Sequence, residues 1–180
     1  MAALRGGSVA DSVLPLEVER KFLVPTPPDW LSSCAVEEIE QGYLAIEGDE
    51  IEVRLRRSGT DLYLTVKRGS GPERIEVEIE VGAEQFEALW PLTAGRRLSK
   101  ARHHVPTDGG DIEVDVYRET LEGLITAEIE FPPGDQPQSF EPPEWLGDEL
   151  TGNAAYANKS LATRGVPPDA PVQRAPRRDS

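Results

Sequence analysis

The stretch Leu16-Glu17-Val18-Glu19-Arg20-Lys21-Phe22-Leu23-Val24 decides the predicted fold. Its pattern is typical of a strand, in which successive side chains point to opposite faces. Glu17, Glu19 and Lys21 therefore share one face, which carries two carboxylates and an ammonium group where a core-facing strand would carry apolar residues. A single strand at a sheet edge could show such a face to water. The prediction depends on whether the pattern recurs.

The same alternation does recur along the chain, between short turn sequences. Seven further stretches are predicted to be strands: 39–46, 51–56, 62–67, 74–81, 98–105, 111–117 and 124–131. In the clearest of them, 74–81, four apolar side chains alternate with one arginine and three glutamates. With the first stretch, these segments predict eight strands joined mostly by short connections.

Other parts of the chain follow a helical period or carry neither pattern. Apolar residues spaced i, i+3, i+4 predict one amphipathic helix over 83–91. Short helices are expected near 144–150 and over 154–164, the second with Asn153 as its N-cap and Gly165 just beyond its end. The expected organisation is a flexible leader over 1–13, one domain over 14–164 and a disordered tail over 165–180.

The polar face of the predicted strands consists almost entirely of Glu, Asp, Arg, Lys and Tyr. One interpretation is an open antiparallel sheet with this face in water. Solvated faces, however, usually mix Ser, Thr and Gln with charge, and eight strands are enough to close a barrel and remove its edges. We therefore expect a mainly β fold with flanking helices (α+β): an eight-stranded antiparallel closed β-barrel with helices on its apolar outside and charge in its lumen.

Composition limits the classes of partner. The chain has 180 residues, with 19 Lys and Arg against 33 Asp and Glu, a formal net charge of −14. This charge repels nucleic acids and anionic membranes, so neither is expected as a partner. The single cysteine, Cys34, excludes an internal disulfide, and no apolar run approaches the ~20 residues that cross a bilayer. A cytoplasmic protein is expected, and its oligomeric state stays open.

A charged lumen is unstable unless charged ligands occupy it, because unpaired buried charge costs several kcal/mol per group. The bases suit the oxygens of a phosphate chain, and the carboxylates suit Mg²⁺ or Mn²⁺ better than zinc. The bases are Lys21, Arg54, Arg56, Lys67, Lys100 and Arg102. The carboxylates are Glu17, Glu19, Asp115, Glu128 and Glu130. No Walker glycine loop is present to grip phosphate by backbone amides.

An ordered set of short motifs carries a family resemblance over roughly residues 15–164. The motifs are Glu17-Val18-Glu19-Arg20-Lys21, Gln41-Gly42-Tyr43-Leu44, Glu52-Val53-Arg54-Leu55-Arg56, Leu64-Thr65-Val66-Lys67, Glu76-Val77-Glu78, Gly95-Arg96-Arg97 with Lys100-Ala101-Arg102, Glu113-Val114-Asp115, Glu128-Ile129-Glu130-Phe131 and Tyr156-Ala157-Asn158-Lys159. The first of them fits an ExExK signature. With these motifs the chain resembles the CYTH-type triphosphate tunnel metalloenzymes, and looks most like the short bacterial members that hydrolyse inorganic tripolyphosphate.

The resemblance implies roles for individual residues. It implies metal coordination by Glu17, Glu19, Asp115, Glu128 and Glu130. It implies phosphate binding by Lys21, Arg54, Arg56, Lys67, Arg102 and Lys159, with Lys100 contributing. The expected catalytic residues are Glu17, Glu19, Lys21 and Lys100, and the sequence does not choose between Glu17 and Glu19 as the proton acceptor.

Three alternatives to the inorganic triphosphatase stay open at this point. Two are enzymes on the same scaffold: a class IV-type adenylate cyclase, and a thiamine or nucleoside triphosphatase. The third is a non-catalytic polyphosphate-binding module. The full acidic set argues against simple binding, which needs bases more than it needs five carboxylates. All of these readings have a small-molecule polyphosphate as the partner.

Overall fold

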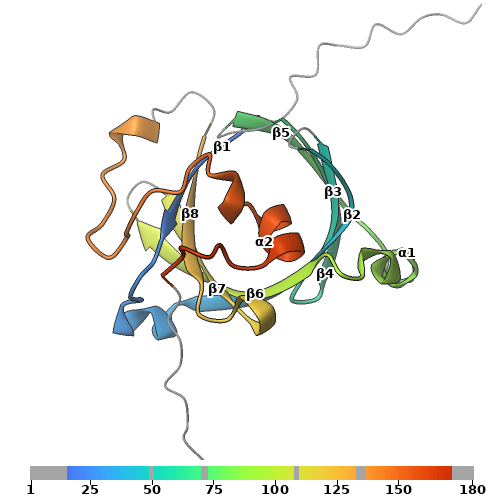
Figure 1. The fold of residues 1–180 in the computed structure, drawn as a ribbon, viewed down its shortest axis with the longest axis horizontal. Coiled ribbons are helices and arrows are strands. Elements are labelled where there is room, and N and C mark those ends of the chain that lie inside the picture. The colour runs from blue at the N-terminus through green and yellow to red at the C-terminus, as the bar shows by residue number, and fades with distance from the viewer. Residues whose placement is uncertain (1–15, 49–50, 70–72, 108–109, 133–136, 172–180) are drawn as a thin grey trace, which may run out of the picture.

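The structure, a computed structural model, describes residues 16–48, 51–69, 73–107, 110–132 and 137–171. Eight antiparallel strands close into a barrel in the order β1-β5-β4-β3-β2-β6-β7-β8 (Figure 1). The strands are β1 (Leu16–Leu23), β2 (Ala35–Glu47), β3 (Ile51–Ser58), β4 (Asp61–Arg68), β5 (Glu73–Glu80), β6 (Arg97–Thr107), β7 (Gly110–Tyr117) and β8 (Ile125–Phe131). The predicted closed barrel is confirmed, and all eight predicted strands are present. The leader expected over 1–13 lies outside the described residues.

The helices are short. The α-helices are α1 (Ala83–Leu89) and α2 (Asn158–Arg164), and the 3-10 turns are η1 (Asp29–Ser33), η2 (Trp90–Thr93), η3 (Glu119–Leu121), η4 (Pro137–Ser139) and η5 (Ala154–Tyr156). The helix expected over 154–164 is broken at Ala157, whose ψ of 138° is extended. Asn153 caps η5 as predicted, by accepting a hydrogen bond from the Ala155 N–H. No helix in the described ranges is long and apolar enough to cross a membrane.

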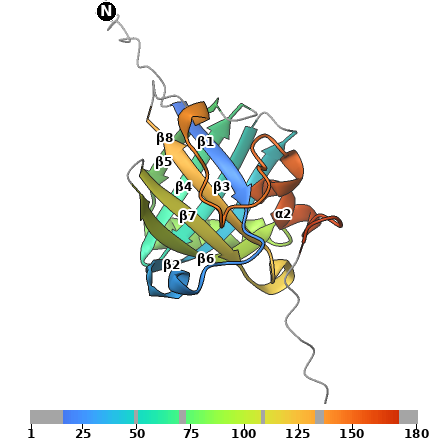
Figure 2. The same cartoon turned by 90° about the vertical axis from the view of Figure 1, so that its left-hand side faces the viewer.

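The prediction of a helix over 144–150 is wrong. Its first residues form a turn, in which Leu146 N–H donates to Pro143 O (3.0 Å), and the following residues lie along β1, where Gly147 N–H donates to Leu23 O (2.8 Å) and Leu150 N–H donates to Lys21 O (2.8 Å). The cause lies in β1, which pairs with β5 only through Leu16–Val18. Backbone groups further along that edge need other partners, and the segment supplies them. Residues 137–151, called the strap below, lie beside β1 (Figure 2), and the bridge between Phe22 and Glu149 joins their last part to the sheet.

A β-bulge in β2 changes which side chains enter the lumen. The register with β3 shifts between Tyr43 and Ala45, so that Ile46 lies opposite Glu52. Uninterrupted alternation would have put Ile46 on the face opposite Tyr43. The extra residue of the bulge instead returns Ile46 to the face shared by the lumen residues.

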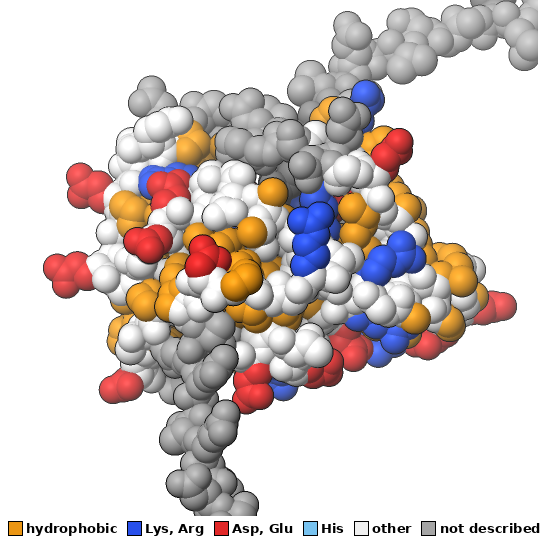
Figure 3. Space-filling model, viewed as in Figure 1, with side chains coloured by type: hydrophobic (Ala, Val, Ile, Leu, Met, Phe, Trp, Pro, Cys, Tyr) orange, Lys and Arg blue, Asp and Glu red, His pale blue; other side chains and the backbone are white. Residues whose placement is uncertain are grey.

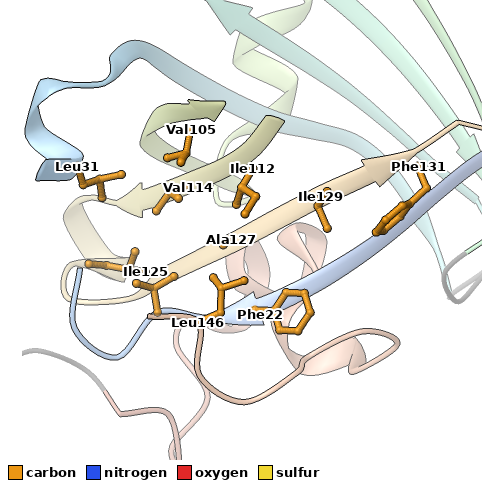
Figure 4. Packing of buried hydrophobic residues seen from close by; sticks show 11 residues of the cluster. Phe22, Leu31, Val105, Ile112, Val114, Ile125, Ala127, Ile129, Phe131 and Leu146 are labelled. Carbon is orange, nitrogen blue, oxygen red and sulfur yellow. The ribbon is translucent and has the colours of Figure 1, made fainter. Parts of the chain in front are cut away.

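The apolar outside of the barrel is covered unevenly. Over β1 and β6–β8, a buried cluster joins the strands to Leu31 of η1 and Leu146 of the strap (Figure 4). Over β4 and β5, by contrast, Val66, Val77 and Ile79 remain exposed. The expectation that helices lie over the apolar outside does not hold for this part. Helix α1 contacts β4 but leaves these three side chains uncovered.

A second cluster closes the mouth of the barrel where β1 and β7 end. It joins Leu23 and Tyr117 to Tyr156 and to Leu161 of α2. Residues 165–171 were expected to belong to a disordered tail. They are described in the structure, with Val166 and Ala170 packed against this cluster. Residues 172–180 lie outside the described part.

Arg20, on the outer face of β1, holds the strap in place. Its guanidinium group donates to both carboxylate oxygens of Glu149 (2.9 and 2.7 Å). It also donates to the backbone carbonyls of Pro137 (3.1 Å) and Phe140 (2.9 Å), and it lies 5.0 Å from the centre of the Phe22 ring. One side chain therefore fixes both ends of the strap, which leads the chain to α2.

Replacing Arg20 tests this anchor. Arg20→Ala leaves two carbonyls and a carboxylate without their donor, and we expect the free energy of unfolding to fall by about 2 kcal/mol. The matched control is Arg118→Ala, because Arg118 pairs with Glu38 on the surface, where both side chains are at least half exposed. That change should cost less than about 1 kcal/mol. Equal losses in urea unfolding of the two variants would contradict the role of Arg20.

Candidate functional site

The lumen carries two groups of paired charges on different walls of the barrel. The first, here the β6–β1 wall, consists of Lys100 and Arg102 on β6, Glu113 and Asp115 on β7, Glu128 on β8 and Lys21 on β1. The second, here the β3–β5 wall, consists of Arg54 and Arg56 on β3, Lys67 on β4, and Glu76 and Glu78 on β5. Strand alternation brings each of these side chains to the inner face.

Asp115 is the centre of the β6–β1 wall. Arg102 holds it by a two-pronged contact, Nε to Oδ1 and Nη2 to Oδ2, each 2.8 Å long. Lys100 donates a further hydrogen bond to Oδ2. The Asp115 side chain is completely buried, and those of Lys100 and Arg102 are 2% and 10% exposed. Two bases therefore neutralise one buried carboxylate at close range.

The same wall extends through Glu128 to β1. Nζ of Lys21 lies 2.9 Å from one carboxylate oxygen of Glu128, and Nη2 of Arg102 lies 3.2 Å from the other. Arg102 also donates to Glu113 through Nη1. Arg102 thus contacts three carboxylates, and its position decides the geometry of this wall.

Burial and neighbouring charges together set the pKa values of the side chains in the β6–β1 wall. Burial lowers the pKa of Lys100, and the Arg102 charge adds to this effect against the opposing pull of Asp115, leaving a pKa of about 8. For Glu128, burial acts to raise the pKa, but Lys21, Lys100 and Arg102 outweigh it and hold the pKa well below its ordinary value. Lys100 therefore remains mostly protonated at pH 7 but loses its proton more readily than an ordinary lysine, whereas Glu128 stays ionised.

The β3–β5 wall repeats the arrangement. Glu76 lies 2.5 Å from Nζ of Lys67 and 3.2 Å from Nη2 of Arg54. Glu78 accepts hydrogen bonds from Arg56 (2.7 Å) and from the Thr65 hydroxyl (2.7 Å). Both of these glutamates of β5 therefore pair with lumen bases.

A buried donor on this wall has no partner. Nε of Arg56 is buried without a hydrogen-bond partner within the described part of the chain. A buried unsatisfied donor costs about 1–3 kcal/mol, so it points to a ligand that would accept from it. A phosphate oxygen is such an acceptor.

The carboxylates of β1, β7 and β8 meet across the sheet. Glu19 lies directly opposite Glu130, and Glu113 lies directly opposite Glu128. Like charges in opposite positions destabilise a sheet unless a cation lies between them. Carboxylate oxygens are the ligands that Mg²⁺ and Mn²⁺ prefer, so this donor set fits a divalent cation.

The predicted metal ligands are not all gathered at one point. The described residues contain no group of three or more His, Cys, Asp or Glu side chains arranged to hold a metal ion. Asp115 and Glu128 lie in the buried wall, and Glu130 is exposed near the end of β8. Glu17 is described only by its backbone, which lies opposite Arg74.

Helix α2 brings Lys159 to one mouth of the lumen. The helix contacts β2 and β6, and Nζ of Lys159 donates to the carbonyl of Gly48, just after β2 (3.2 Å). Figure 1 looks into the ring of strands and shows α2 within its outline. In the space-filling view of the same face, atoms fill this ring and Lys and Arg side chains are exposed among hydrophobic ones (Figure 3).

The sequence analysis gave no role to Glu113, Glu76 or Glu78. Glu113 precedes Asp115 by two residues on a strand, so the alternation that selected Asp115 also pointed to Glu113. Glu76 and Glu78 carried the same signal. What the sequence could not give was their partners, because Arg102 and Glu113 meet only through the β6–β7 pairing.

Taken together, fold and site define a class of protein: an antiparallel barrel that binds a charged small ligand in its lumen. Comparison with known proteins identifies the family. The CYTH domain profile matches residues 15–165, and the chain belongs to the CYTH family.

The relatives are inorganic triphosphatases by name. One from Nitrosomonas europaea is 44% identical over 147 residues, which cover 81% of this chain and 96% of that protein. One from Acetivibrio thermocellus is 37% identical over 148 residues, 81% of this chain and 92% of that protein. A crystal structure of an inorganic triphosphatase is 42% identical, with a TM-score of 0.61 over 82% of this chain and 94% of that one.

Asp115 and Glu130 should differ sharply in their contribution to stability. Asp115→Asn leaves Lys100 and Arg102 without their shared negative charge, and we expect the free energy of unfolding without metal to fall by about 3–5 kcal/mol. Glu130→Gln, at an exposed position, should change it by less than about 1 kcal/mol. Urea unfolding in the presence of chelator measures both. A loss below about 1 kcal/mol for Asp115→Asn would refute the central place of this residue.

Proposed function

We propose that this protein hydrolyses inorganic tripolyphosphate to pyrophosphate and phosphate with the help of Mg²⁺ or Mn²⁺. The observation that carries the proposal is the mutual neutralisation of bases and carboxylates within the lumen. A phosphate chain with a divalent cation can replace both partners of such ion pairs, the phosphate on the bases and the cation on the carboxylates. The inorganic triphosphatases to which the chain is similar support the same reaction.

The substrate-binding residues are proposed to be Lys21, Arg54, Arg56, Lys67, Lys100, Arg102 and Lys159. Arginine offers bidentate contacts to phosphate oxygens, and Arg56 has a buried Nε without a partner in the described residues. Lys100, with its pKa of about 8, gains proton affinity as an anionic phosphate approaches, because an opposite charge favours its protonated form. These bases would hold the chain in place and balance the charge that spreads over the transferred phosphoryl group.

The metal ligands are proposed to be Glu17, Glu19, Asp115, Glu128 and Glu130. A divalent cation held there would supply positive charge to the phosphate oxygens and make a bound water more acidic. In the proposed hydrolysis the water oxygen bonds to the terminal phosphorus, the bridging P–O bond breaks, and pyrophosphate leaves. Glu17 or Glu19 would accept the proton from the water, and the sequence does not choose between them.

The aromatic side chains of the lumen support an inorganic substrate. A nucleoside needs an apolar or aromatic pocket beside its phosphates. Tyr43 and Tyr117 are buried, and their hydroxyl groups are hydrogen-bonded to Gln41 and Asn158. The ring of Tyr63 lies 5.1 Å from the guanidinium carbon of Arg56. All three tyrosines already contact other side chains of the protein, so their rings would add little binding free energy for the adenosine of ATP.

The substrate prediction follows. We expect kcat/KM for tripolyphosphate to exceed that for ATP at least about tenfold, roughly 1.4 kcal/mol of transition-state binding. Phosphate release from the two substrates at one metal concentration measures it, and assays for cyclic AMP test the cyclase alternative. Equal or faster turnover of ATP, or any cyclic AMP, would overturn the choice of substrate. Tripolyphosphate binding without phosphate release would identify a binding module instead.

The proposed function also predicts that phosphate release depends on a divalent metal ion. Chelator should abolish phosphate release, and Mg²⁺ or Mn²⁺ should restore it, because the carboxylates repel a polyanion in the absence of cations. Glu19→Gln should lower kcat at least about 100-fold at saturating Mg²⁺. The control Glu38→Gln alters an exposed surface carboxylate and should leave kcat within about twofold. Undiminished turnover in excess chelator would contradict the metal proposal.

A further inference from the structure

Tyr117 links the charged lumen to helix α2. It is the last residue of β7 and lies directly opposite Lys100, whose Nζ is 5.8 Å from the centre of the tyrosine ring. Its hydroxyl group donates a hydrogen bond of 2.6 Å to Oδ1 of Asn158, the first residue of α2. The Tyr117 side chain is therefore in contact with the β6–β1 wall on one side and with α2 on the other.

Helix α2 depends on such contacts for its position. It has seven residues, and Ala157 at its N-cap makes no side-chain capping hydrogen bond. A helix this short is unstable alone, so tertiary contacts decide where it lies. The polar contacts of its first turn include those of Asn158 with Tyr117 on β7 and of Lys159 with the Gly48 carbonyl after β2.

These two contacts reach different parts of the barrel rim. β7 and β2 are separated by β6 in the ring of strands. The first turn of α2 therefore spans the rim above β6, where Lys100 lies. Adjacent residues on one helical turn move together, so the contact made by Asn158 determines where Lys159 can reach.

We propose that Tyr117 is a positioning residue that, through its hydrogen bond to Asn158, holds α2 at the mouth of the lumen so that Lys159 can bind the substrate. The role of Lys159 in this inference rests on the proposed function. The Tyr117 hydroxyl is assigned no contact with the substrate, because its hydrogen bond is donated to Asn158.

Tyr117→Phe removes only the hydroxyl group. We expect KM for tripolyphosphate to rise about fivefold, roughly 1 kcal/mol, with kcat within about twofold, because the reacting groups in the lumen stay in place. Asn158→Ala should reproduce this effect, and the double variant should be no worse than either single one. Lys159→Ala should raise KM less in the Tyr117→Phe background than in the wild type.

Amide hydrogen exchange tests the anchor without substrate. Exchange over 158–164 should be about fivefold faster in Tyr117→Phe. Asn158→Asp keeps an acceptor oxygen, so its exchange should match the wild type. The matched control is Tyr156→Phe, which removes a hydroxyl from the same buried cluster but leaves the Tyr117–Asn158 hydrogen bond intact. Its exchange and its KM should both stay at wild-type values.

Several results would overturn the inference. One is unchanged exchange over 158–164 in Tyr117→Phe. Another is a fall in kcat at constant KM, which would make Tyr117 part of the reaction itself. Failure of the wild-type protein to hydrolyse tripolyphosphate would count against the proposed function instead. The exchange measurement uses no substrate, so the two failures are distinguishable.

Discussion

The contact of Arg102 with Asp115 is the interaction on which the lumen depends. A closed barrel with charge inside must neutralise that charge locally, because water cannot do so once the side chains are buried. Arg102 does this for three carboxylates at once, and Lys100 and Lys21 complete the balance. In the β3–β5 wall the charges are neutralised separately, and Glu76 pairs with both Arg54 and Lys67. The sequence led us to expect that charged ligands must balance the lumen. The described charges instead balance one another, and both signs of charge line the lumen.

This balance explains how one lumen can accept two kinds of ligand. An anion alone would have to displace carboxylates and leave them unpaired, and a cation alone would do the same to the bases. Under the proposed function they would replace both partners together, so polyphosphate and metal would favour one another's binding. The directly opposed carboxylates Glu19 and Glu130 belong to the set proposed to hold the cation.

Closure of the barrel leaves part of the β1 edge without a neighbouring strand, and another segment of the chain pairs with it. β1 pairs with β5 over only its first residues, and the strap completes the rest of its edge. Arg20 holds the strap, and the strap leads to α2 at the mouth. The outer face of β1 therefore supports the position of the helix that carries Lys159, although Arg20 itself points away from the lumen.

The sequence by itself determined the strands and most of the residues that face inward, because alternation along a strand is a local property of the chain. It identified the lumen bases, most of the carboxylates and the family resemblance that the comparisons confirm. It missed the bulge that turns Ile46 inward, the pairing of the strap with β1 and the exposed outer face at Val66, Val77 and Ile79, because all three depend on neighbouring segments. Only the tertiary structure decided which acid neutralises which base. Arg102 meets Asp115 through the pairing of β6 with β7, and Lys21 meets Glu128 through the pairing of β1 with β8, two strands from opposite ends of the domain. Register between such distant segments is set by closure of the whole barrel, and no local pattern encodes it.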